Sequence, residues 1–380
     1  MTAMTRREIL ASAAAACTVA VPAFAQGQAT ALHALARAKG MRFGSCFAWS
    51  APGADAGSFA NPAYAALLER ECGILVPENE FKWQAVRPDS HRFDVTRFAD
   101  MLDYAEAKGM AMRGHTLLWH KAQYMPKWLL GHDFGPKPRA GAEALLTNHI
   151  RTLCKLYGSR IVSFDVVNEA VDEKTGLLRE TRLSKAFGDT EAMLDLAFHT
   201  ARETAPGAEL VYNDYMSWEG GNETHRAGVL RLLEGFRKRG VPVDALGVQS
   251  HIGVYGNPAQ SAARQEADWR RFLDQVVAMG YKLLITEFDV NDKDLPKDPK
   301  IRDAGVAAYA DAYLAMMFAY PQLRDVLVWG MCDKYGWLNG FSPRADGSLK
   351  RATPYDDRFR AKPLRDVFAR RFAAAAARPG

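Results

Sequence analysis

The sequence predicts a single (β/α)8 barrel, an α/β fold, and three observations lead to this prediction. Short apolar segments alternate with amphipathic stretches along the chain, as in a parallel sheet whose strands are joined by helices. No GxGxxG loop, typical of an open doubly wound sheet, follows the first apolar segment. The 380 residues are enough for one barrel. The eight apolar segments are 41–47, 74–76, 111–116, 161–167, 209–212, 245–249, 282–286 and 326–329.

The stretches between these segments have the periodicity of amphipathic helices. In DVTRFADMLDYAEAKGM (94–110) the apolar residues fall on one face, with Asp94 as the expected N-cap and Gly109 as the stop. The segment 268–280 shows the same pattern and ends at Gly280. Further helices are expected at about 62–71, 142–157, 190–204, 223–239, 301–318 and 362–373. Eight strands, each followed by a helix, are the count of a barrel.

The first 25 residues are typical of an export signal. Arg6 and Arg7 precede an Ala-rich apolar run at 9–21, and Ala23-Phe24-Ala25 fits a signal-peptidase site. We therefore expect a twin-arginine signal at 1–25, a catalytic domain at 26–380, and a periplasmic or secreted protein. A membrane anchor is the weaker alternative, because the apolar run is shorter than the ~20 residues that a span needs.

Composition and charge exclude several classes of function. The chain is 48% hydrophobic and 24% charged, as in ordinary globular proteins, and its net charge is only +5. The basic residues are scattered, which argues against a nucleic-acid partner. Four cysteines remain after the signal, and none forms a CxxC pair, so we expect buried free thiols rather than a zinc site. They are Cys46, Cys72, Cys154 and Cys332.

Polar residues follow the expected strands at the end where a barrel carries its active site. These strand ends read PENEFKW (77–83), GHTLLWH (114–120), NE (168–169), NDY (213–215), QSH (249–251), TEFD (286–289) and WGMCDKYGW (329–337). A single polar strand end is unremarkable, since strands end at surfaces. Seven in succession at one rim indicate a lined cleft.

The residue types at this rim favour a carbohydrate ligand. Phosphate chemistry would need a Gly-rich nest and several basic residues, and the rim offers only Lys82 clearly. No HExxH or GxSxG motif is present, so neither a metal site nor a serine-hydrolase nucleophile is expected. Indole rings stack on sugar faces, while amides and carboxylates hydrogen-bond sugar hydroxyls.

Two glutamates of the rim are candidates for glycosidic bond cleavage, which needs two carboxyl groups on opposite sides of the bond. Glu169 and Glu287 end the fourth and seventh strands, roughly opposite each other around the barrel mouth. One group must be protonated and the other ionised. Their proximity helps, because the negative charge of one favours the protonated form of the other.

These segments resemble the signature segments of glycoside hydrolase family 10, the retaining endo-β-1,4-xylanases. FDVVNEA, ITEFD, GHTLLWH, ENEFKW, NDY, GVQSHI and WGMCDKYGW occur in the order and at spacings compatible with the family, over about 41–370. The resemblance implies a monomeric hydrolase of xylan or xylo-oligosaccharides with no cofactor. It also implies no membrane association after signal cleavage.

The resemblance also implies roles for individual residues. Glu169 corresponds to the acid/base and Glu287 to the nucleophile. His251 and Asp289 correspond to partners that keep Glu287 ionised, and Asn168 to a ligand of the sugar 2-hydroxyl. Further substrate-binding residues are implied at Glu78, Asn79, Lys82, His115, Trp119, Gln249, Trp329 and Trp337.

Other interpretations of these residues stay open from sequence alone. Glu78 and Lys82 could form a surface ion pair, His115 could be a core histidine, and Trp329 could be barrel packing. Two segments depart from the family: WHKAQYMPKW is about two residues longer, which leaves the role of Gln123 open, and Met216 replaces an amide. The substrate could be another β-1,4-glycan or an aryl glycoside. A non-catalytic xylan-binding protein is the remaining alternative.

Overall fold

The computed structural model describes residues 30–253 and 258–378, without the side chains of 258–265. The expected export signal at 1–25 lies outside these residues. The part from Ala31 onward forms one compact unit.

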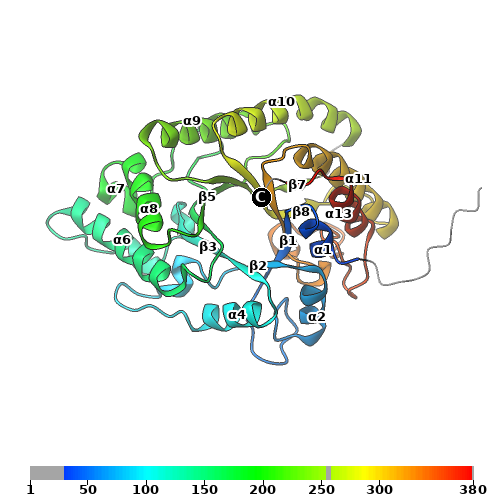
Figure 1. Cartoon of the computed structure of the whole chain (residues 1–380), viewed down its shortest axis with the longest axis horizontal. Helices are drawn as coiled ribbons and strands as arrows, with labels where there is room; N and C mark the ends of the chain where they lie inside the picture. The colour runs from blue at the N-terminus through cyan, green and yellow to red at the C-terminus, as the bar shows by residue number, and fades with distance from the viewer. Residues whose placement is uncertain (1–29, 254–257, 379–380) are drawn as a thin grey trace, which may run out of the picture. The chain divides into compact units, whose positions relative to one another are not determined.

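The strands form a closed parallel barrel, as the sequence predicts (Figure 1). Its strands are β1 (Arg42–Phe47), β2 (Ile74–Pro77), β3 (Ala111–Trp119), β4 (Ser163–Asn168), β5 (Glu209–Asp214), β6 (Ala245–Val248), β7 (His251–Gly253), β8 (Lys282–Asn291) and β9 (Leu323–Val328). Closure is made by β1, which pairs with β2 on one side and β9 on the other. The third and seventh expected strands are longer than the apolar segments alone indicate, and they carry polar residues toward the rim.

The sixth barrel strand is divided into two pieces. Both β6 and β7 pair with β8, and Gln249 and Ser250 lie between them. Ser250 has a φ of +63°, a left-handed conformation that few residues other than glycine adopt. This break lets Gln249 and His251 both reach the rim.

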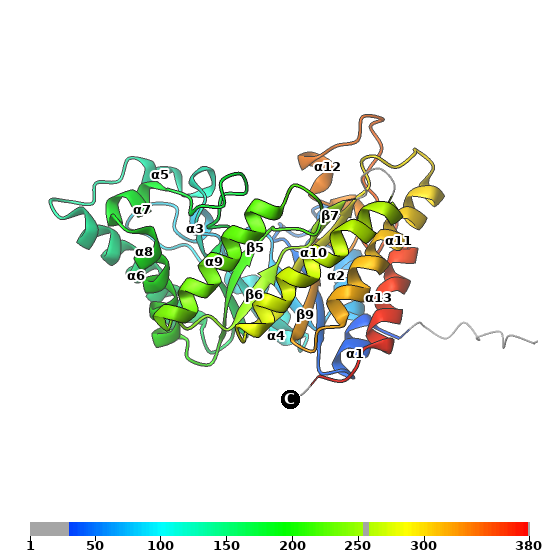
Figure 2. The same cartoon turned by 90° about the horizontal axis from the view of Figure 1, so that it is seen from above.

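Helices surround the barrel (Figure 2). They are α1 (Leu32–Arg37), α2 (Pro62–Glu71), α3 (Trp83–Val86), α4 (Thr96–Ala107), α5 (Lys127–Leu130), α6 (Pro138–Tyr157), α7 (Arg182–Phe187), α8 (Thr190–Thr204), α9 (Glu223–Arg239), α10 (Pro258–Ala278), α11 (Pro299–Phe318), α12 (Leu338–Phe341) and α13 (Pro363–Ala374), with 3₁₀ turns at Ala122–Tyr124 and Asp333–Tyr335. Asp94 is not the N-cap of α4. Val95 takes that place without a side-chain bond, and Asp94 accepts instead from the Thr96 amide at 3.4 Å.

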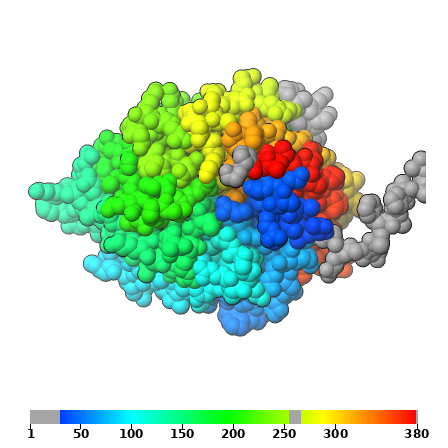
Figure 3. Space-filling view, in the orientation of Figure 1, coloured from blue at the N-terminus to red at the C-terminus, as the bar shows by residue number. Residues whose placement is uncertain are grey.

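The hydrophobic core fills the space between the strands and the helices. The N-terminal and C-terminal parts of the described chain are in contact. Helices α1 and α13 lie side by side (Figure 3), and the Arg378 amide donates to the Lys39 carbonyl at 2.8 Å. The four cysteines of this unit are buried and free, which confirms that prediction. Within the described ranges, no helix is long and apolar enough to cross a membrane.

Candidate active site

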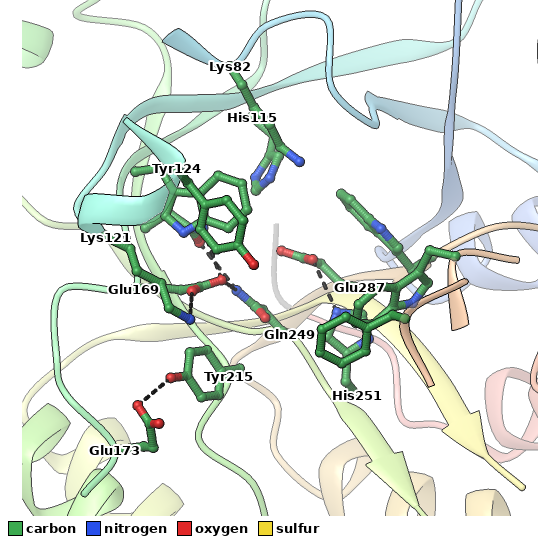
Figure 4. Close-up of a pocket in the computed structure, with 15 residues that line it drawn as sticks. Lys82, His115, Lys121, Tyr124, Glu169, Glu173, Tyr215, Gln249, His251 and Glu287 are labelled. Carbon is green, nitrogen blue, oxygen red and sulfur yellow. Dashed lines mark hydrogen bonds and ion pairs between the residues drawn. The ribbon is translucent and has the colours of Figure 1, made fainter. Parts of the chain in front are cut away.

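A cavity of about 420 Å³ opens at the carboxyl ends of the barrel strands (Figure 4). Its lining residues come from most of the strand ends and the loops after them: Lys82, His115, Trp119, Lys121, Tyr124, Asn168, Glu169, Glu173, Tyr215, Gln249, His251, Glu287, Trp329, Trp337 and Phe341. The rim that the sequence predicts is therefore a real cavity, and both candidate glutamates face it.

Glu287 lies in β8 and is held ionised by its surroundings. Its carboxylate accepts a hydrogen bond from Asn213 Nδ2 at 2.8 Å and another from His251 Nε2 at 3.3 Å. Burial alone would raise the pKa of Glu287. The His251 hydrogen bond, the positive charges of His115 and His251, and the Asn213 bond outweigh burial and lower this pKa to about 2.

His251 is charged because a second carboxylate lies behind it. Its Nδ1 is 3.0 Å from Asp289 Oδ2, and the same oxygen accepts the Trp337 Nε1–H at 2.6 Å. Burial lowers the pKa of His251, but Asp289 and then Glu287 overcome this effect and raise it to about 10. The imidazolium thus lies between the carboxylates of Asp289 and Glu287, as the sequence interpretation predicts.

Glu169 follows β4 in a backbone conformation that few side-chain-bearing residues adopt. Its φ is +55°, and its amide donates to the Asn213 carbonyl at 2.9 Å, which anchors this turn. The residue as a whole is only 6% exposed. Its carboxylate accepts from Gln249 Nε2 at 3.0 Å and forms an ion pair with Lys121 Nζ at 3.0 Å.

A chain of side-chain amides joins the two glutamates. Gln249 Nε2 donates to Glu169 Oε1 at 3.0 Å and to Asn168 Oδ1 at 3.3 Å. Asn213 Nδ2 donates to the same Asn168 oxygen at 2.9 Å and to Glu287 Oε1 at 2.8 Å. The Thr286 hydroxyl donates to Asn213 Oδ1 at 2.7 Å and so orients that amide. The two carboxyl groups are therefore connected through the side chains of Gln249, Asn168 and Asn213.

The predicted sugar ligands after β2 fall in two places. Lys82 lines the cavity and donates to Asn79 Oδ1 at 2.9 Å, while Asn79 itself is exposed. Glu78 lies in an adjoining hollow with Trp329 and Trp337. Burial raises the pKa of Glu78, although the charge of Lys82 opposes this, and burial lowers that of Lys82. No Glu78–Lys82 ion pair occurs among the described residues, so the surface-pair alternative is wrong.

The aromatic residues that the sequence marks are all close to the cavity. Trp119 stacks on Tyr124 with ring centroids 3.9 Å apart, and Lys82 Nζ lies 4.7 Å from the centroid of the Trp119 ring. Trp329 is 6% exposed, so it both packs in the barrel and borders the cavity. Trp337 is fixed by its bond to Asp289 and by stacking on Phe341 at 4.6 Å.

His115 combines the two interpretations that the sequence left open. It is 2% exposed, and its Nδ1 is 2.9 Å from Asp165 Oδ2. Arg113 binds the other oxygen of Asp165 at 2.5 Å. His115 is thus a partnered core histidine whose ring also borders the cavity, with an edge-to-face contact to Trp329 at 5.4 Å.

Comparison with known proteins agrees with this geometry. The model of Glycosyl hydrolase family 10 matches residues 31–370, nearly the whole described unit. The chain belongs to glycosyl hydrolase family 10.

Relatives of this family 10 chain include two named xylanases. Endo-1,4-beta-xylanase 1 of Gibberella zeae is 30% identical over 294 residues, which is 77% of this chain and 78% of the relative. Endo-1,4-beta-xylanase B of Thermotoga neapolitana is 28% identical over 318 residues, 83% of both chains. Xylanase 10B from Thermotoga petrophila, solved with xylobiose, superposes with a TM-score of 0.79 at 27% identity. The matched region covers 92% of this chain and 98% of the Thermotoga petrophila chain.

Sequence patterns alone miss several residues in and behind the cavity of this family 10 protein. Asn213 begins the NDY strand end and was given no role, although it contacts both Asn168 and Glu287. Lys121 and Tyr124 come from the longer WHKAQYMPKW segment, and Tyr215 and Glu173 from the loops after β5 and β4. A polar residue directly after the expected strand 209–212 was the available signal for Asn213, and the extra length of WHKAQYMPKW was the signal for Lys121.

The two open positions of the family 10 resemblance lie away from the cavity lining. Gln123 is exposed, and Met216 is fully buried. The described residues contain no cluster of three or more His, Cys, Asp or Glu that could hold a metal ion.

Proposed function

We propose that this protein is a retaining endo-β-1,4-xylanase in which Glu169 is the acid/base and Glu287 is the nucleophile. One observation carries the proposal: two buried carboxyl groups share a cavity, yet their surroundings differ. Glu287 is held by an imidazolium and an amide N–H, which keep it ionised. Glu169 accepts from the Gln249 amide, pairs with the Lys121 ammonium and faces the cavity.

The reaction requires the two carboxyl groups in different states, with Glu287 ionised and Glu169 carrying a proton. In the first step a carboxylate oxygen of Glu287 attacks the anomeric carbon, and the bond to the leaving oxygen breaks. Glu169 gives its proton to that oxygen, so a neutral hydroxyl leaves. In the second step Glu169 takes a proton from water, the water oxygen attacks the same carbon, and Glu287 is released. Two inversions retain the configuration.

Xylose-based chains fit this cavity better than glucose-based chains. The Trp337 indole is held on one edge by Asp289 and on its face by Phe341, so it cannot easily move aside. Xylose lacks the hydroxymethyl group of glucose, and a fixed indole disfavours that extra bulk. The named relatives are endo-1,4-beta-xylanases. A β-1,4-glucan or aryl glycoside substrate is the second candidate for the same machinery.

Hydrolysis of xylan and of a matched β-1,4-glucan tests the proposal. Wild type is compared with Glu287→Ala and with Glu234→Gln, an exposed control on α9. We expect xylan cleavage by wild type and the control, with the β-anomer formed first in NMR, and none by Glu287→Ala. Equal activity of Glu287→Ala would refute the nucleophile assignment. Equal turnover of glucan would favour the second candidate, and binding without any product would favour a non-catalytic protein.

We also propose that residues 1–25 direct export through the twin-arginine route and that the mature protein is a monomer. The Arg6-Arg7 pair and the Ala23-Phe24-Ala25 site support the first statement. Large exposed apolar side chains that lie on separate elements, for example Leu130, Leu156 and Ile301, support the second. Cells expressing the Arg6→Lys, Arg7→Lys variant should retain the enzyme inside. Exported wild type should begin at Gln26 and elute as a monomer.

A further inference from the structure

We propose that Lys121 makes the leaving-group side of the cleft a binding site for a carboxylate on the substrate, that is, for a xylan chain bearing a uronic acid substituent. The proposal rests on the proposed function, because it takes Glu169 as the acid/base.

The longer segment WHKAQYMPKW places Lys121 in the cavity. The Lys121 amide donates to the Trp119 carbonyl at 2.9 Å, and its carbonyl accepts from the Tyr124 amide at 2.9 Å. The short 3₁₀ turn Ala122–Tyr124 that follows reverses the chain. Lys121 therefore points inward beside Glu169, as Figure 4 shows.

The surroundings of the Lys121 ammonium are unusual for a cation that lines a sugar-binding cavity. Its side chain is 21% exposed, and Nζ lies 3.0 Å from Glu169 Oε2. The rings of Tyr215 and Tyr124 are 4.7 and 5.5 Å away and hold the ammonium between them. In Figure 4 the Tyr215 ring lies on the side of Glu169 away from Glu287, which is where the leaving part of a substrate must lie.

Catalysis removes the partner that this cation has in the free protein. The first chemical step uses Glu169 with its proton on, and a neutral carboxyl group does not balance the Lys121 charge. A largely buried ammonium without an anion is unfavourable. A carboxylate on the bound sugar chain can replace Glu169 as the partner, so that Lys121 keeps an anion while Glu169 holds its proton.

The other carboxylate on this side of the cavity is already engaged. Glu173 accepts from the Tyr215 hydroxyl at 2.7 Å and from Arg179 at 2.5 Å. Burial raises the pKa of Glu173, but these two partners and others outweigh burial and lower it to about 2. Arg179 neutralises Glu173, so Glu173 does not take the place of Glu169 as the partner of Lys121.

A carboxylate is a better partner for Lys121 than the sugar hydroxyls. A charge-assisted hydrogen bond is about twice as strong as a neutral one. Hydroxyls would also leave the ammonium without a counter-charge. A uronic acid is a sugar that carries a carboxylate, so it can be attached to a xylan chain as a substituent and present that carboxylate to Lys121.

The test compares two xylo-oligosaccharides that differ in one group. One carries a uronic acid on the leaving-group side, and the other carries the same substituent with its carboxylate reduced to an alcohol. The ratio of their kcat/KM values is measured for wild type, Lys121→Met, Lys121→Arg and Lys127→Met, an exposed lysine on α5. Calorimetry with Glu287→Ala protein, with and without Lys121→Met, measures the ratio of the dissociation constants of the two compounds in the absence of turnover.

We expect wild type and Lys127→Met to favour the acid by about tenfold, decreasing with added salt. Lys121→Met should bring the ratio close to one, and Lys121→Arg should restore part of it. A wild-type ratio of one, or an unchanged ratio in Lys121→Met, would overturn the proposal. If wild type cleaved neither compound, the proposed function would fail, whereas the binding ratio would still decide the role of Lys121.

Discussion

Replacing His251 by Asn should move the acid limb of the pH–activity profile to higher pH. In the folded protein the pKa of Glu287 falls from its ordinary 4.5 to about 2, although burial acts in the opposite direction. This difference corresponds to roughly 3 kcal/mol in favour of the ionised carboxylate. His251 contributes to it twice, through its hydrogen bond to Glu287 and through its charge. Asn at position 251 removes the positive charge. Burial, which raises the pKa of Glu287, is then opposed by fewer interactions.

The assay is kcat/KM for an aryl β-xylobioside with an activated leaving group, from about pH 2 to pH 8, so that it includes the wild-type acid limb. This ratio reports the ionisation of the free enzyme, and the activated leaving group makes proton donation by Glu169 less important. We expect the acid limb of His251→Asn to rise by about one pH unit or more. His91→Asn, at an exposed histidine, is the control. Circular dichroism at each pH excludes unfolding as the cause, and an unmoved acid limb would refute the reasoning.

The same two groups affect stability with opposite signs. The lowered pKa of Glu287 gives stability that is present above pH 4.5 and is lost as pH falls toward about 2. The raised pKa of His251 gives stability that is fully present below pH 6.5 and is lost as pH rises through about 10. His251→Asn should therefore have a flatter dependence of unfolding free energy on pH than wild type.

Three further predictions concern neighbouring groups. Glu169→Gln should lose most activity on xylan but much less on nitrophenyl glycosides, since good leaving groups need little protonation; equal losses on both would contradict the acid role. Asn213→Ala deprives Glu287 and Asn168 of a hydrogen-bond donor, so kcat/KM on xylan should fall roughly 10- to 100-fold. A decrease below about twofold would mean that catalysis does not need the chain of amides. Arg113→Met leaves Asp165 buried without its guanidinium and should cost about 3–5 kcal/mol in urea unfolding, while exposed Arg139→Met should cost little.

The fold and the two glutamates were predictable from sequence for a simple physical reason. Apolar segments of strand length that alternate with amphipathic stretches have few ways to bury both faces, and a barrel is one. In a barrel every strand ends at the same rim, so Glu169 and Glu287 had to share a cavity although they are 118 positions apart in the sequence. Positions 287 and 289 lie on one side of a strand, which brought Asp289 to His251.

Other features were decided only by the packed structure. The break between β6 and β7, the left-handed backbone of Glu169, and Asn213 as the centre of the amide chain all depend on how neighbouring strands are staggered. The Lys121–Glu169 ion pair depends on the path of a turn. Sequence patterns indicate which residues lie at the carboxyl-terminal rim of the barrel. Hydrogen bonds of about 3 Å between separate strands follow from register and side-chain rotamers, which only the assembled barrel determines.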